Sequence, residues 1–137
     1  MCSSDLISDG HAHEAMIAAD AILLASGTAA LEALLAKRPM VVAYRISSLT
    51  YFIVKTFGLM RITHYSLPNV LANDAVVPEL MQENCTAGNI ADAIKPMLDA
   101  PENYTALMQK FTRIHQNLRR DANHLAADVV LDLVNKP

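Results

Sequence analysis

The most constraining feature of this chain is an apolar run that leads through Ser-Gly-Thr into an alanine- and leucine-rich stretch. The run covers residues 21–25, the turn is Ser26, Gly27 and Thr28, and the stretch continues to Ala36. This order predicts a strand, a tight turn and the start of a helix. Gly27 allows a positive φ and lets the backbone come close to a ligand.

The predicted helix start suits an anion. The first N–H groups of a helix have no partner within the helix, and its dipole adds about half a positive charge there, so phosphate is a natural guest. Glu32 lies one turn beyond Thr28, too far for a capping box, and its carboxylate suits sugar hydroxyls. The pattern indicates a nucleotide-sugar diphosphate whose ribose is held by Glu32. The alternative is a plain N-cap with Glu32 as a solvated helix residue.

A second strand is expected directly after this helix. Lys37 and Arg38 fit a helix C-terminus, Pro39 stops the helix, and residues 40–44 form an apolar, β-branched run typical of a buried parallel strand. Strand, helix and strand make a right-handed βαβ unit. Ligands of open α/β sheets bind outside the carboxyl ends of the strands, where the Ser-Gly-Thr turn and Arg45 both fall.

Upstream, residues 11–19 read as a short helix with Met16 and Ile17 facing inward. His11 and His13 suggest a metal site, but the sequence near them offers no third ligand. Solvated or capping histidines therefore explain them better, and no metal is expected.

Composition fits one domain with one core and no membrane span. The chain has 137 residues, 53% of them hydrophobic, but no apolar run approaches the roughly 20 residues that cross a bilayer. No signal peptide is visible. Cys2 and Cys85 form no metal or disulfide pattern, which fits a reducing cytoplasm.

The charge distribution says more than the net charge of −3. No acidic residue occurs between Glu32 and Asp74, and that interval holds five basic residues: Lys37, Arg38, Arg45, Lys55 and Arg61. A positive middle suits a diphosphate, a phosphorylated lipid or an anionic membrane surface. Nucleic acid is not expected, because the basic residues are sparse and no reading motif is present.

Residues 49–60 form an apolar, aromatic segment between Arg45 and Arg61. It is too short to span a membrane and reads as a helix that ends at Gly58. Basic flanks around apolar residues indicate a segment lying in a membrane interface. A core helix, or one buried in a dimer, explains the pattern equally well.

Two prolines mark the next motifs. Pro68 is expected to force Leu67 into an extended conformation, with Asn69 presenting a donor and an acceptor from the turn. Pro78 is expected to begin a helix with Glu79 in its first turn, which is ordinary capping geometry, so Glu79 and Gln82 are only secondary site candidates. Beyond them, apolar stripes predict three helices, at residues 86–100, 104–118 and 125–134, with His115 packed on the second.

Four motifs together resemble one family. DAILLASGTAALE at 20–32, KRPMVVAYR at 37–45, SLPNVLA at 66–72 and VPELMQE at 77–83 look like the C-terminal part of bacterial lipid-A-disaccharide synthase. The order and spacing of the motifs make the resemblance specific. It runs from residue 7 to the C-terminus, whereas residues 1–6 look like an artificial or mis-joined start.

The resemblance implies an α/β fold: the Rossmann-like, donor-binding half of a B-type glycosyltransferase, followed by C-terminal helices. The family joins UDP-2,3-diacylglucosamine to 2,3-diacylglucosamine 1-phosphate with inversion, releasing UDP. It implies a peripheral enzyme on the cytoplasmic face of the inner membrane, without a cofactor, whose C-terminal elements can exchange within a homodimer. The acceptor half and its general base are expected to be absent from residues 7–137, so the fragment alone is expected to be inactive.

The resemblance also implies roles for single residues. Backbone N–H groups of Ser26, Gly27 and Thr28 would hold the diphosphate, Glu32 the ribose and Arg45 the sugar or phosphate, while Asn69 would orient a substrate group as a catalytic residue. Two rival interpretations are another UDP-sugar enzyme of this fold, such as the peptidoglycan N-acetylglucosaminyltransferase, and a non-catalytic nucleotide-binding module.

Overall fold

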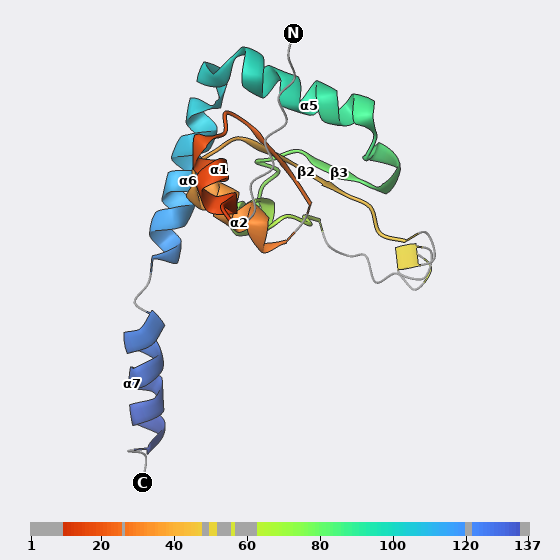
Figure 1. Cartoon of the computed structure of the whole chain (residues 1–137). Helices are drawn as coiled ribbons and strands as arrows, with labels where there is room; N and C mark the ends of the chain where they lie inside the picture. Colours follow the sequence, from red (N-terminus) through yellow and green to blue (C-terminus); the bar gives the residue numbers. More distant parts are fainter. Residues whose placement is uncertain are drawn as a thin grey trace.

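The computed structural model describes residues 10–25, 27–47, 50–51, 56, 63–119 and 122–134. Helices and strands alternate in its first part, and helices make up the rest (Figure 1). In chain order the elements are α1 (Ala12–Ala18), β1 (Ile22–Leu24), α2 (Thr28–Leu35), β2 (Met40–Tyr44), α4 (Leu67–Ala72), β3 (Glu79–Met81), the 3-10 turn η1 (Gln82–Asn84), α5 (Ala87–Asp99), the 3-10 turn η2 (Pro101–Tyr104), α6 (Thr105–Leu118) and α7 (Ala122–Val134).

The three strands form one parallel sheet in the order β1-β2-β3. Ile22 pairs with Met40 at one end of β2, and Tyr44 pairs with Met81 at the other. In Figure 1, α5 lies along one side of the sheet and α2 along the other. The predicted mixed α/β fold with a βαβ unit is therefore confirmed, and all three strands end at one edge.

The end of α2 shows why the second strand starts where it does. Lys37 has a φ of 56°, its N–H donates to the Leu34 carbonyl at 3.0 Å, and the Arg38 N–H donates to the Ala33 carbonyl at 3.2 Å. This pair of bonds is a Schellman cap, which satisfies the last carbonyls of the helix. Pro39 then prevents a further turn, so the chain enters β2.

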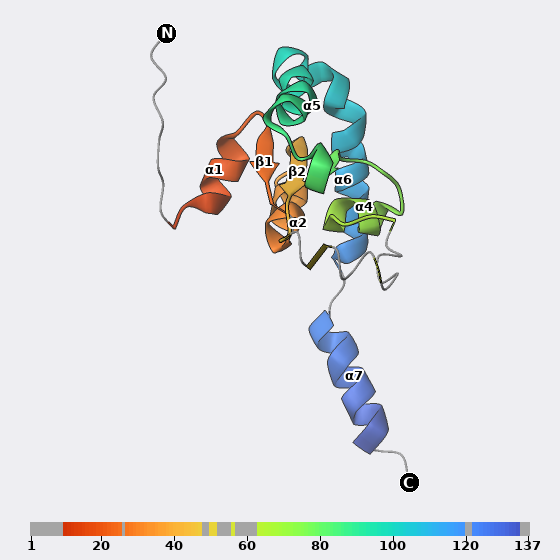
Figure 2. The same cartoon turned by 90° about the vertical axis from the view of Figure 1, so that its right-hand side faces the viewer.

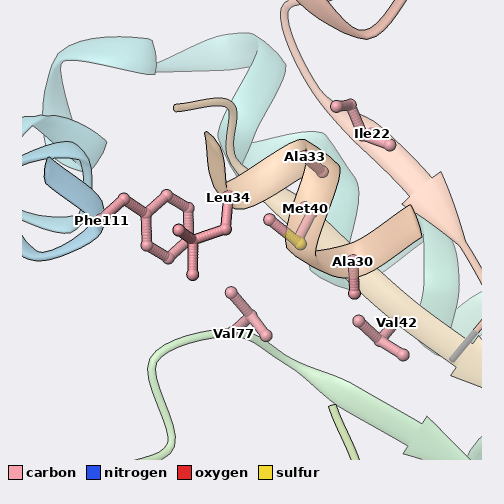
Figure 3. Packing of buried hydrophobic residues seen from close by; sticks show 8 residues of the cluster. All are labelled: Ile22, Ala30, Ala33, Leu34, Met40, Val42, Val77 and Phe111. Atoms are coloured by element: carbon pink, nitrogen blue, oxygen red, sulfur yellow. The ribbon is translucent and has the colours of Figure 1, made fainter. Parts of the chain in front are cut away.

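The core lies where α2, α6 and the sheet meet. Figure 3 shows Phe111 of α6 facing Leu34 of α2, with Met40 and Val77 beside them. Phe111, Leu34 and Met40 are all fully buried. Because α2 is rich in alanine, it can approach the sheet closely, and Ala30 and Ala33 are also fully buried.

Several expectations about elements are confirmed. β2 spans the predicted residues, α1 and α2 match within about a residue at each end, and α5, α6 and α7 occupy the three predicted helical stretches. Thr86 caps α5 by accepting a hydrogen bond from the Asn89 N–H at 3.2 Å. His115 is half-buried on α6, with its Nδ1 3.3 Å from the Lys37 ammonium, so it is the packed histidine expected.

Three expectations are wrong. Ile17 was expected to face inward, but it is 47% exposed. Of the two residues expected to do so, only Met16 packs against the core. Leu67 is the first helical residue of α4, and the extended residue is Ser66, with a ψ of 143°. Proline fits the first turn of a helix because the N–H it lacks would be unpaired there, and this outweighs its effect on the residue before it.

The third correction concerns Pro78. No helix begins there: Glu79–Met81 is the strand β3, parallel to β2. The fixed φ of proline suits the first residue of a strand as well as the first of a helix. Its carbonyl remains available, and it accepts a hydrogen bond from the Val42 N–H at 3.0 Å. The ladder therefore begins at Pro78 without needing the missing donor.

The last helix stands apart from the rest. Both Figure 1 and Figure 2 show α7 projecting away from the other elements. Five of its apolar residues are more than half exposed: Val129, Val130, Leu131, Leu133 and Val134. None of the helices in the described part of the chain is long and apolar enough to cross a membrane. The predicted interfacial helix at 49–60 lies almost wholly outside the described residues, as do residues 1–6.

Candidate functional site

The predicted phosphate turn has an open helix start. Gly27 is the N-cap of α2, with a φ of 145° that favours glycine, and no side chain caps the helix at this position. A Cβ placed on Gly27 would meet no atom within 4 Å, and Thr28 begins the helix in an exposed position. The start of α2 at Gly27 is therefore neither capped by a side chain nor filled beside its Cα. Ser26 lies outside the described residues.

Glu32 and Arg45 carry the charges around this turn. Glu32 is exposed on α2, one turn after Thr28, and Arg45 is exposed directly after β2. Within the described ranges, neither side chain forms a hydrogen bond or an ion pair. Both charges are thus available to a ligand at the carboxyl edge of the sheet, where α/β proteins bind their ligands.

Glu79 gathers hydrogen bonds from the segment before α4. Its Oε1 accepts from the Ser66 hydroxyl at 2.6 Å, the Ser66 N–H at 2.8 Å and Asn69 Nδ2 at 2.8 Å. The Tyr65 N–H donates to the same carboxylate, at 3.1 Å from Oε2. One carboxylate therefore ties β3 to the residues that lead into α4.

The pKa of Glu79 follows from this environment. Partial burial raises the pKa of its carboxyl, but hydrogen bonds from Ser66, Tyr65 and Asn69 outweigh burial and hold the pKa below its ordinary value of 4.5. The carboxylate is therefore ionised at neutral pH, in the form that accepts four hydrogen bonds. These bonds give Glu79 a structural role, because they join the start of β3 to the segment that leads into α4.

Asn69 is the other centre of this cluster. It is 1% exposed, and its Oδ1 accepts from the N–H groups of Val76 and Val77 at 2.8 and 2.9 Å. Its Nδ2 donates to the Val77 carbonyl at 2.9 Å and to Glu79. These partners fill the two acceptor and two donor positions of the amide. The catalytic role of Asn69 stays a prediction; the contacts favour a positioning role through α4 and β3.

The cluster also contains a residue that the sequence did not single out. Ser66 is fully buried and reaches Glu79 with both its hydroxyl and its N–H. One sequence signal could have drawn attention to Ser66: it stands two residues before Pro68, and serine favours the N-cap position at the start of a helix. Gln82, the last candidate, is buried directly after β3, as the first residue of η1.

Among the described residues, no three His, Cys, Asp or Glu side chains come together as metal ligands. His11 lies instead near Glu14, at 3.8 Å, on the surface of α1. A cavity of about 290 Å³ lies between α4 and α6, lined in part by Leu71, Lys110 and Ile114, and no residue of the phosphate turn is among its lining residues.

Known proteins match most of the chain. A family model described as Lipid-A-disaccharide synthetase matches residues 2–130. This chain is 50% identical to the Lipid-A-disaccharide synthase of Xanthomonas axonopodis pv. citri over 128 residues, which make up 93% of the chain and 29% of that protein. It is 47% identical over the same share to the Lipid-A-disaccharide synthase of Xylella fastidiosa strain M23, covering 33% of it. The chain thus spans a third or less of these relatives.

Proposed function

This chain belongs to the lipid-A-disaccharide synthetase family, and from this premise we propose that it is the UDP-sugar-binding part of a lipid A glycosyltransferase. Residues 7–137 are the Rossmann-like donor half of a B-type fold, with added C-terminal helices. The complete enzyme transfers 2,3-diacylglucosamine from UDP to 2,3-diacylglucosamine 1-phosphate. The acceptor half supplies the general base, so the chain alone is inactive.

The observation that carries this proposal is the open start of α2 beside two unpaired charges. N–H groups at Gly27 and Thr28, with Ser26, hold the diphosphate and stabilise the negative charge that develops on UDP as it leaves. Arg45 adds positive charge at the next strand end, and Glu32 binds the ribose hydroxyls. Helix start and arginine together supply the charge that a metal would otherwise provide. Asn69 and Glu79 join α4 to the start of β3.

The phosphate turn gives the direct test of this function. In the complete natural protein, Gly27→Val is expected to weaken UDP binding at least tenfold, or about 1.4 kcal/mol. The valine side chain would fill the open space that the ligand needs, at a φ that a β-branched residue avoids. Isothermal titration with UDP measures the change, and the same variant should lose transfer activity.

Two further variants serve as controls in the same titration. Gly88→Val places the same side chain in open space at the start of α5 and should leave UDP binding unchanged. Glu32→Ala should weaken the binding of UDP but not the binding of inorganic pyrophosphate, since pyrophosphate has no ribose. Equal UDP affinities for Gly27→Val and the wild type would rule out this site. UDP binding by a wild type that forms no disaccharide would leave a binding module only.

The partners extend the proposal to surfaces. Acylated substrates and the apolar, basic-flanked residues 49–60 support peripheral attachment to the cytoplasmic face of the inner membrane. The exposed apolar face of α7 supports pairing of two copies through the C-terminal helices. Co-sedimentation with anionic vesicles and light scattering test these two points. A protein left in the supernatant, or a single-chain mass, would contradict them.

A further inference from the structure

Gln82 holds a buried donor without a partner. The residue is 9% exposed, and its Nε2 is the one buried side-chain nitrogen or oxygen in the described part of the chain that lacks a hydrogen-bond partner. Buried polar groups are nearly always hydrogen-bonded, because an unpaired donor loses water without gaining an acceptor. This exception therefore asks for an explanation, and a ligand is a recognised one.

The backbone at Gln82 is also unusual. Three non-glycine residues in the described ranges have a positive φ: Lys37, Asn73 and Gln82. Lys37 and Asn73 end helices, where the left-handed conformation is common. Gln82, with a φ of 49°, instead starts η1 immediately after a strand, so no helix end accounts for it. Such backbone conformations gather at ligand sites, where surrounding structure maintains them.

The position of Gln82 adds the third observation. Tyr44 and Met81 are register partners on the parallel strands β2 and β3, which lie side by side in Figure 1. Arg45 and Gln82 are the next residues on the two chains. Neighbouring strands are about 4.8 Å apart, so both residues leave the sheet close together at its carboxyl edge. This is the edge that carries the phosphate turn.

We propose that the Gln82 amide donates a hydrogen bond to an uncharged oxygen of the sugar in the bound UDP-sugar. This inference rests on the proposed function. Arg45 beside it suits the phosphate charge, whereas a neutral amide suits a hydroxyl or carbonyl oxygen. Nε2 has no internal partner to give up, so turning it toward the ligand breaks no hydrogen bond. Gln82 thereby distinguishes the UDP-sugar from UDP.

The test compares two ligands on the complete natural protein. Gln82→Met keeps an unbranched side chain of similar length but removes the amide. The variant is expected to lower the affinity for UDP-diacylglucosamine about 5- to 10-fold, which corresponds to one lost hydrogen bond, and to change the affinity for UDP less than about twofold. Its thermal unfolding midpoint should not fall, since the variant also removes an unpaired buried donor. Gln116→Met, on the exposed face of α6, is the matched control.

A second variant guards against misfolding. Gln82→Asn keeps an amide and tolerates the left-handed backbone, but its side chain is one methylene shorter, so it should show the same selective loss. Unchanged affinity for UDP-diacylglucosamine, or parallel losses for both ligands, would overturn the inference. Failure of the proposed function looks different, because the wild type itself would then not bind the UDP-sugar.

Discussion

Replacing Phe111 by alanine is expected to lower the free energy of unfolding by about 3–5 kcal/mol. Phe111 is fully buried and brings α6 onto α2, where it faces Leu34 (Figure 3). Removing its ring takes apolar contacts from both helices and leaves a cavity. The short alanine side chains of α2 cannot fill it. Urea unfolding followed by circular dichroism measures the loss.

Leu118→Ala on the same helix provides the comparison. Leu118 is 43% exposed, so its truncation should cost less than about 1 kcal/mol. Both variants remove a large apolar side chain from α6 and differ chiefly in burial. If Phe111→Ala destabilised the protein no more than Leu118→Ala, this result would contradict the packing of α6 against α2 through Phe111.

Local sequence predicts the first half of the fold well because its elements follow local rules. The β-branched run of β2 and the alanine and leucine residues of α2 each have one clear periodicity and clear stop signals. Gly27 is the N-cap of α2 and has the positive φ that the sequence suggested. The positions of the turn and of Arg45 at one sheet edge then follow from parallel topology alone.

Prediction failed where distant contacts choose between two local options. Pro78 followed by Glu79 fits a helix start and a strand start equally well. What selects the strand is pairing with β2 and the bonds from Ser66 and Asn69 to the Glu79 carboxylate. These partners lie 10 and 13 residues earlier in the chain, beyond the reach of a local pattern.

The same limit applies to the candidate site. The sequence named Asn69 as a site candidate and Gln82 as a secondary one, but it did not show what surrounds them. A fully bonded amide and one with an unpaired nitrogen look alike in a sequence, and only the fold shows that Asn69 has four hydrogen bonds while Gln82 Nε2 has none. Gln82 therefore becomes a better candidate than Asn69 for direct contact with the substrate.

Replacing Glu79 by glutamine is expected to lower the free energy of unfolding by about 2–4 kcal/mol at pH 7. Hydrogen bonds to a charged group contribute about 1.5–3 kcal/mol each, and partial exposure reduces their sum. The variant keeps the shape of the side chain but removes the charge that strengthens the bonds from Ser66 and Asn69 to Oε1, and it puts an NH2 group in the Oε2 position, where the Tyr65 N–H donates. Two donors then face each other without an acceptor. Urea unfolding at pH 7 measures the difference.

The effect of pH has a definite sign. The pKa of Glu79 is lower in the folded protein than its ordinary value of 4.5, so ionisation stabilises the fold. That contribution is complete above the unfolded pKa and is lost as the pH falls through the folded pKa. The difference in stability between the wild type and Glu79→Gln should therefore stay constant from pH 7 down to about 4.5 and narrow below that value.

Glu83→Gln gives the matched control for this measurement, because Glu83 is an exposed glutamate four residues further along the chain. It should change the stability by less than about 0.5 kcal/mol. A gap between the wild type and Glu79→Gln that widened in acid would mean that burial, not hydrogen bonding, dominates at Glu79. A gap near zero at pH 7 would mean that β3 and α4 are held together by apolar packing alone.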